Sequence, residues 1–236
     1  MSQTTLKEQV ARAALEEIRD DLKSDSIVGI GTGTTADVFI DLLCSSGIRF
    51  RGAVSSSERS AARLERQGVE IFDLNDVDGL QLYIDGADEI TETLDMLKGG
   101  GGALTREKIV AAAANRFVCI ADESKLVSKL GKFGLPVEVI PMARHYVELR
   151  LASLYPGDRA PDIRLRLKQD GTPFITDNHN QILDIHGLLF DSPDVIETFL
   201  DGLSGAVCNG LFAKRGADVL LLASEVNGIV RYLRNP

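Results

Sequence analysis

Three short glycine-containing segments hold the residues best suited to chemistry, and the first spans residues 29–35. It reads Gly-Ile-Gly-Thr-Gly-Thr-Thr and stands between an apolar run and a segment with helical periodicity. Glycine lets the backbone approach a ligand, and the free amides at a helix N-terminus attract an anion. The hydroxyls of Thr32, Thr34 and Thr35 add donors. The pattern is typical of a site for a phosphate monoester.

Two other interpretations of this segment stay open, and a third is excluded. Gly31, Gly33 and Ala36 fit the G-x-G-x-x-A pattern of dinucleotide sites, but the next predicted strand ends in serines where an acidic residue would bind a ribose diol. A turn with a purely structural role would also use glycines. A nucleotide P-loop needs Gly-Lys-Ser/Thr, and because no lysine lies nearby we reject it.

The second segment, Asp85-Gly86-Ala87-Asp88-Glu89, follows an apolar run at 82–84. Open α/β sheets bind ligands at the carboxyl ends of their strands, so Asp85 and Asp88 could contact a sugar hydroxyl or exchange protons. Clustered carboxylates also suit Mg²⁺, although nothing else in the sequence completes such a site. In the alternative interpretation this segment is a structural turn, in which Asp85 caps the next segment and takes no part in binding or catalysis.

The third segment places Lys98 before four glycines and a helical segment that contains Glu107. Four consecutive glycines cost backbone entropy that a plain surface loop rarely requires. Lys98 could present a cation to a developing oxyanion. Glu107 could act as a base whose proton affinity is set by burial against Lys98 and by the helix dipole. In the alternative interpretation, residues 105–108 are a solvated helix start.

The elements that position these segments alternate between helix and strand in the first half of the chain. We predict helices at 5–18, 35–46, 57–67 and 105–114, and strands at 27–30, 50–54, 69–72, 82–84 and 117–120. This alternation indicates a mostly parallel sheet with helices on both faces.

The pattern changes near residue 131 to that of a small α+β unit. We predict strands at 137–140 and 206–208, helices at 142–154 and 194–200, and a hairpin of 174–176 with 182–185. Alternation at 163–168 predicts a further strand, on which Arg164, Arg166 and Lys168 form a solvated face or a partner interface. The apolar run 219–223 is expected to return to the first sheet.

The resulting fold class is α/β, with a Rossmann-like catalytic domain formed by residues 1–131 and 208–236. Residues 132–207 form an inserted α+β domain of ferredoxin-like type, for which we expect a role in oligomerisation. The sequence contains no internal repeat.

Composition narrows the function classes further. The net charge is −9 and lysines and arginines are scattered among carboxylates, so we expect no nucleic-acid partner. No apolar run approaches the roughly 20 residues that cross a bilayer, and residues 1–15 lack a signal-peptide core. Three isolated cysteines suit a reducing compartment. We therefore expect a cytoplasmic protein without a membrane partner.

Together the motifs resemble those of the ribose-5-phosphate isomerase type A family. The resemblance extends over nearly the whole chain, in seven segments that occur in order: 29–35, 54–57, 85–90, 98–101, 103–108, 134–141 and 210–213. Several motifs in a fixed order are far more specific than any single glycine loop.

The resemblance implies an aldose–ketose isomerase of the pentose phosphate pathway that interconverts D-ribose 5-phosphate and D-ribulose 5-phosphate through an enediolate, without metal or coenzyme. It places the family's proton acceptor on Glu107 and gives catalytic roles to Asp85, Asp88 and Lys98. It also implies a homodimer or homotetramer. The substrate-binding residues that it implies are Lys7, Thr32, Gly33, Thr34, Thr35, Asp85, Gly86, Ala87, Asp88, Lys98, Gly99, Gly100, Gly101 and Lys125.

Four features depart from the family pattern. Thr34 replaces a common serine, Gly102 a common alanine and His179 an expected glycine, and the stretch 155–161 is longer than usual. Two rival functions would use a similar fold: a non-catalytic sugar-phosphate sensor, as in some transcription regulators, and an NAD-dependent dehydrogenase. The presence of every acid–base candidate favours the isomerase over the sensor, and saturable NADH binding would favour the dehydrogenase.

Overall fold

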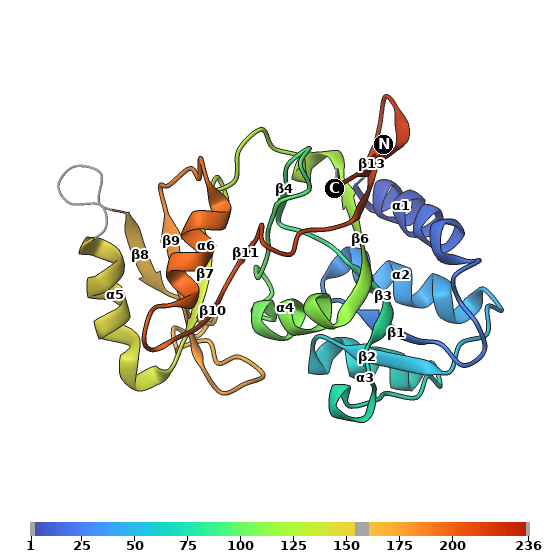
Figure 1. Cartoon of the computed structure of the whole chain (residues 1–236), viewed down its shortest axis with the longest axis horizontal. Coiled ribbons are helices and arrows are strands. Elements are labelled where there is room, and N and C mark those ends of the chain that lie inside the picture. The colour runs from blue at the N-terminus through green and yellow to red at the C-terminus, as the bar shows by residue number, and fades with distance from the viewer. Residues whose placement is uncertain (1–2, 154–160, 235–236) are drawn as a thin grey trace.

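The computed structural model describes residues 3–153 and 161–234. A six-stranded sheet forms the centre of the larger of its two units (Figure 1). The strand order is β13-β12-β6-β3-β1-β2. All neighbouring strands are parallel except β13, which pairs antiparallel with β12. The strands are β1 (Ile27–Ile30), β2 (Gly52–Ser55), β3 (Leu80–Asp85), β6 (Ala114–Asp122), β12 (Val219–Ser224) and β13 (Gly228–Leu233).

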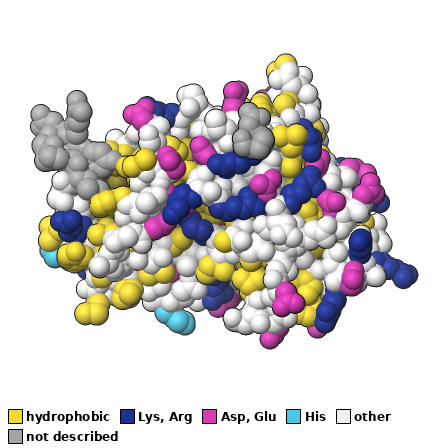
Figure 2. Space-filling view, in the orientation of Figure 1, with side chains coloured by type: hydrophobic (Ala, Val, Ile, Leu, Met, Phe, Trp, Pro, Cys, Tyr) yellow, Lys and Arg dark blue, Asp and Glu magenta, His cyan; other side chains and the backbone are white. Residues whose placement is uncertain are grey.

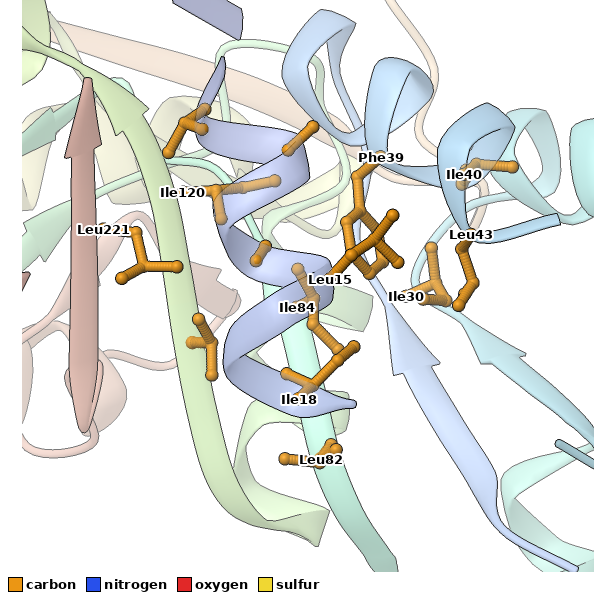
Figure 3. Packing of buried hydrophobic residues seen from close by; sticks show 14 of the residues in the cluster. Leu15, Ile18, Ile30, Phe39, Ile40, Leu43, Leu82, Ile84, Ile120 and Leu221 are labelled. Carbon is orange, nitrogen blue, oxygen red and sulfur yellow. The ribbon is translucent and has the colours of Figure 1, made fainter. Parts of the chain in front are cut away.

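Helices cover both faces of this sheet because its strands are apolar on both sides. Val118 and Ile120 of β6 pack in a core cluster with α1 (Gln3–Ile18), α2 (Thr34–Ser45) and α3 (Glu58–Arg66). Phe117 and Cys119 pack on the opposite face with α4 (Leu104–Ala113). Figure 3 shows side chains of α1 and α2 against the sheet residues Ile30, Leu82, Ile84 and Ile120.

The second unit contains a four-stranded antiparallel sheet with the order β10-β7-β9-β8. Along the chain its elements are β7 (Leu135–Val139), α5 (Arg144–Ser153), β8 (Asp162–Leu165), β9 (Gln181–His186), α6 (Pro193–Asp201) and β10 (Ala206–Asn209). A separate core cluster joins both helices to this sheet. A three-stranded sheet of β4 (Glu89–Ile90), β5 (Met96–Leu97) and β11 (Leu211–Phe212) lies between the two units (Figure 1).

Three short 3-10 helices complete the regular structure of the described residues: η1 (Leu74–Asp76), η2 (Glu123–Lys125) and η3 (Pro141–Ala143). Within those residues, no helix is both long and apolar enough to cross a bilayer. On the face shown in Figure 2, Lys and Arg side chains gather near the middle with acidic side chains among and around them.

The structure confirms the mostly parallel sheet and the return of 219–223 to it as β12. The hairpin prediction was wrong, because 174–176 is not a strand and β9 pairs with β7 and β8. The segment 69–72 contributes only a single bridge, from Ile71 to Ala53. Residues 154–160, which include the end of the predicted helix 142–154 and most of the longer stretch 155–161, lie outside the described residues.

The burial of Phe39 in the α1–α2 core generates a stability prediction. Its side chain is fully buried, so Phe39→Ala should lower the free energy of unfolding by about 3–5 kcal/mol through lost burial and a residual cavity. Phe133 is a matched control of the same type, 38% exposed, whose replacement by alanine should cost about 1 kcal/mol or less. Urea titration measures both values, and equal losses would contradict the packing described here.

Candidate active site

The order of the strands creates a crevice at the carboxyl ends of β1 and β3. β1 pairs with β2 on one side and with β3 on the other, so the chain changes direction across the sheet at this point. Ligands of open α/β sheets bind where the strand order reverses in this way. A cleft of about 140 Å³ lies here, lined by Gln3, Lys7, Thr32, Gly33, Thr34, Thr35, Gly86, Ala87, Asp88, Lys98, Gly99, Gly100, Gly101, Glu107 and Lys125.

The cleft brings together every site residue expected from the sequence except Asp85. It also adds Gln3, at the start of α1, which sequence reasoning missed. Nothing in the local pattern distinguishes a glutamine at the start of a helix from an ordinary solvated residue. Only the packing of α1 beside the carboxyl ends of the strands places Gln3 at the cleft.

One end of the cleft is built to attract an anion. α2 begins at Thr34, directly after the glycine loop, and its N-cap residue Gly33 makes no side-chain cap. The φ angle of Gly33 is 102°, a conformation that glycine adopts without strain. Lys7 of α1 donates to the Thr34 hydroxyl at 2.8 Å, and Lys125 of η2 also lines this cleft. The helix N-terminus and two cations therefore face the same space.

Asp85 lies beneath the cleft and does not line it. Its fully buried carboxylate accepts hydrogen bonds from the backbone amides of Thr32 (3.0 Å) and Gly86 (2.7 Å), from the Tyr83 hydroxyl (2.5 Å) and from Lys98 Nζ (2.8 Å). A Cβ atom at position 31 would lie 1.9 Å from its Cγ atom, so only glycine fits there. Asp85 thus connects the glycine loop after β1 to Lys98.

Tyr83 is a second residue that sequence reasoning missed. It sits in an apolar strand and packs against Phe117, so its pattern is that of an ordinary core residue. Burial, together with the Asp85 carboxylate beside it, raises the pKa of the Tyr83 hydroxyl well above its usual value. The hydroxyl therefore acts as a hydrogen-bond donor to Asp85.

Lys98 is a buried cation between two carboxylates. Its Nζ atom donates to Asp85 and to the Gly86 carbonyl oxygen (2.6 Å), and lies 3.5 Å from Oε2 of Glu107. Burial alone would lower the pKa of Lys98. The negative charges of Asp85 and Glu107 outweigh burial and raise that pKa, so the side chain stays cationic.

Glu107 projects from the first turns of α4 to the wall of the cleft, where its side chain is almost fully buried. Within the described part of the chain, its Oε2 atom accepts no hydrogen bond. Burial, with help from Asp85 and Asp88 and against the effect of Lys98, raises the pKa of Glu107 to about 8. A carboxyl group with this proton affinity can take up and return a proton near neutral pH.

Asp88 connects the third glycine segment, which follows Lys98, to the cleft. It is half-buried, and its Oδ2 atom accepts a hydrogen bond from the Gly100 amide at 2.7 Å. Asp85 and Asp88 thus differ in surroundings although they are three residues apart. The first is a saturated, buried acceptor, and the second lines the cleft.

The interpretation of 105–108 as a solvated helix start was wrong, because its side chains have partners in the second unit. Thr105 donates to the buried carboxylate of Glu138, Arg106 donates to Asn178 at 3.0 Å, and Lys108 binds Glu197 at 2.6 Å. Three neighbours of Glu107 therefore hold α4 against the small sheet. Among the described residues, no group of three or more acidic, histidine or cysteine side chains could hold a metal ion.

Comparison with known proteins shows the family of the chain. The family model of ribose 5-phosphate isomerase A (phosphoriboisomerase A) matches residues 52–227. The chain is 53% identical over 234 residues to ribose-5-phosphate isomerase A of Bordetella avium (strain 197N), covering 99% of this chain and all of that protein.

Two solved structures are similar over nearly their whole length. The crystal structure of ribose 5-phosphate isomerase A from Neisseria gonorrhoeae is 42% identical, with a TM-score of 0.89 over 100% of this chain and 99% of that one. A D-ribose-5-phosphate isomerase in complex with phospho-erythronic acid is 32% identical, with a TM-score of 0.90 over 99% of this chain and 100% of that one. The chain belongs to the ribose 5-phosphate isomerase A family.

Proposed function

We propose that this cleft interconverts D-ribose 5-phosphate and D-ribulose 5-phosphate with Glu107 as the group that moves the proton. The observation that carries the assignment is the Oε2 atom of Glu107. It is buried on the cleft wall, 3.5 Å from the Lys98 cation, and it accepts no hydrogen bond from the described residues. An oxygen in this state is free to bind a substrate proton.

In the forward reaction Glu107 removes the proton from C2 of the open-chain aldehyde. The electron pair forms a double bond between C1 and C2, and O1 takes the negative charge of the enediolate. The proton then returns from Glu107 to C1, while the hydroxyl proton moves from O2 to O1 and O2 becomes the carbonyl oxygen. Every atom is conserved, and the group that is the base in one half-reaction is the acid in the other.

Stabilisation of the enediolate charge falls to Lys98 and to the amide of Gly101. Lys98 already faces Glu107, and its raised pKa keeps it protonated throughout the reaction. Gly101 lines the cleft, and within the described residues its amide has no hydrogen-bond partner. Donors that are fixed before the charge develops need no reorganisation when it does.

The phosphate of the substrate serves as the anchor. The N-terminus of α2, Lys7 and Lys125 bind it at one end of the cleft, and this holds C1 and C2 next to Glu107. Phospho-erythronic acid, which a similar isomerase binds, combines a phosphate with a carboxylate shaped like the enediolate. The same compound should occupy this cleft.

The two aspartates take separate roles in this proposal. Asp88 lines the cleft and assists opening of the furanose ring by proton exchange with a sugar hydroxyl. Asp85 holds Lys98 and the glycine loop in place from below, because its carboxylate already accepts four hydrogen bonds.

We propose the finer domain division as well: a Rossmann-like catalytic domain of 1–131 and 208–236, and a ferredoxin-like domain of 132–207 that contributes to a homodimer or homotetramer in the cytoplasm. The order β7-α5-β8-β9-α6-β10 supports the ferredoxin-like description. The exposed apolar side chains of Met142, Tyr146 and Leu149 on and near α5 support an interface there.

Replacement of the proposed base tests the function directly. Glu107→Gln should reduce kcat for ribose 5-phosphate by about 10³-fold or more, because an amide cannot accept the C2 proton. Binding of ribose 5-phosphate, measured by calorimetry, should persist because the phosphate anchor is intact. Glu65→Gln, on the exposed side of α3, is the control and should leave kcat unchanged. Retained turnover in Glu107→Gln would remove Glu107 from the mechanism.

The raised pKa of Glu107 predicts a pH-dependent difference in stability between the wild type and Glu107→Gln. Between the unfolded pKa near 4.5 and the folded pKa of about 8, the native protein binds the extra proton, so wild-type stability falls as pH rises. The variant lacks this loss. The free energy of unfolding of Glu107→Gln minus that of the wild type, measured with urea, should therefore increase from pH 5 to pH 8. The increase should exceed ~1 kcal/mol, which corresponds to roughly one pKa unit. A difference that is constant with pH would contradict the burial argument.

Treatment with EDTA should leave turnover unchanged, because Lys98 supplies the positive charge that the enediolate needs. The measurement is the formation of ribulose 5-phosphate before and after chelation, with added Mg²⁺ as the control. Loss of activity that Mg²⁺ restores would show that Lys98 is not a sufficient electrophile.

A further inference from the structure

Arg166, directly after β8, links the second unit to the glycine run that follows Lys98. The sequence pattern predicts a solvated side chain here, and that prediction was wrong: only 14% of the side chain is exposed, against 70% for Arg164. Although β8 ends at Leu165, the backbone pairing continues, because the Arg166 amide donates to the Ile182 carbonyl oxygen. The Arg166 side chain pairs with Asp184 and is covered there by the glycine run.

The guanidinium of Arg166 makes two sets of contacts. On one side it forms a two-point ion pair with Asp184 of β9, whose Oδ2 accepts from Nε at 2.9 Å while Oδ1 accepts from Nη2. On the other side Nη1 donates to the carbonyl oxygens of Gly99 (2.8 Å) and Gly100 (3.2 Å). A planar fork with five donors can make both sets at once, which a lysine cannot.

These contacts act on the peptide groups that carry the amides of Gly100 and Gly101. In a trans peptide the C=O and N–H groups face opposite ways, so holding the Gly99 carbonyl directs the Gly100 amide, which donates to Asp88. Holding the Gly100 carbonyl likewise directs the Gly101 amide away from Arg166. Gly101 lines the cleft. Arg166 thus holds the Gly99 carbonyl together with the Gly102 amide, which donates to the same oxygen at 3.0 Å, and it adds a contact to the Gly100 carbonyl in a run whose glycines have little conformational preference of their own.

Arg166 is not needed to dock the two units together. Thr105, Arg106 and Lys108 of α4 already bind the second unit through Glu138, Asn178 and Glu197. The contacts of Arg166 with the glycine carbonyls therefore act mainly on the loop itself.

We propose that the Arg166–Asp184 pair is a positioning device for the isomerase reaction, which aims the amide of Gly101 at the enediolate oxygen. This rests on the proposed function of the cleft. Arg166 does not line the cleft, so its effect passes through the glycine run. Its removal should weaken stabilisation of the transition state much more than binding of the substrate, because the phosphate anchor is built from other segments.

The test compares Arg166→Met and Asp184→Asn with the control Arg164→Met, which alters an exposed arginine two residues away whose ion-pair partner among the described residues is its neighbour Asp162. Arg166→Met should lower kcat by about 10–100-fold, while KM for ribose 5-phosphate stays within about threefold. Asp184→Asn should cause a smaller loss in the same direction. Arg164→Met should match the wild type.

A second measurement separates positioning from a general structural role. The affinity for phospho-erythronic acid should fall in Arg166→Met by a factor similar to the loss in kcat. The affinity for ribose 5-phosphate, measured in a Glu107→Gln background to prevent turnover, should change little. Urea unfolding of each variant establishes that a folded enzyme is compared, and if Arg166→Met does not fold, Asp184→Asn carries the same two readouts.

Three results would overturn the proposal: unchanged kcat in both variants, equal loss of affinity for substrate and for phospho-erythronic acid, or the same loss in Arg164→Met. The Glu107→Gln single variant keeps the two hypotheses apart. If it is inactive while Arg166→Met is fully active, only the positioning role fails. If it retains turnover, the assignment of Glu107 fails whatever the arginine variants show.

Discussion

The structure depends on one buried cation. Lys98 is almost fully buried between Asp85 and Glu107, and the two carboxylates differ in the hydrogen bonds that they accept. Asp85 accepts four hydrogen bonds, whereas the Oε2 atom of Glu107 accepts none among the described residues. A charge buried beside a saturated acceptor is stable, and a carboxylate buried without donors binds protons more tightly. This asymmetry separates a saturated, buried carboxylate from one with a raised pKa, and it is the basis on which we propose Glu107 as the proton acceptor.

The rest of the fold supplies what this cluster requires. Burying a cation and two carboxylates in one place is costly unless the partners are rigidly placed, and the ends of adjacent parallel strands provide that rigidity. Asp85 ends β3, and Gly31 directly follows β1 beside it, where any larger residue would collide with the Asp85 carboxyl group. The phosphate loop and the reactive cluster are therefore parts of one packed arrangement.

The sequence predicted the cleft well because its residues lie in short local motifs at strand ends. It could not separate Asp85 from Asp88, since part of the difference lies in donors from two distant segments, Thr32 after β1 and Lys98 after β5. It misplaced Arg166 because alternation predicts which face a residue occupies but cannot show that the glycine run, distant in the sequence, covers this part of the face. The two-residue strands β4, β5 and β11 are too short to show any period, and half-exposed β13 lacks the apolar signal of the buried strands.

The two units contribute unequally to the cleft. All residues that line the cleft lie between positions 3 and 125, so no described residue of 132–207 contributes to its wall. Yet that unit holds the carbonyl oxygens behind the glycine run and the side chains on either side of Glu107. Lys7, Lys125 and a helix N-terminus give the cleft a local positive character although the net charge of the chain is −9. The second unit thus supports the geometry of a cleft whose described wall belongs to the first unit.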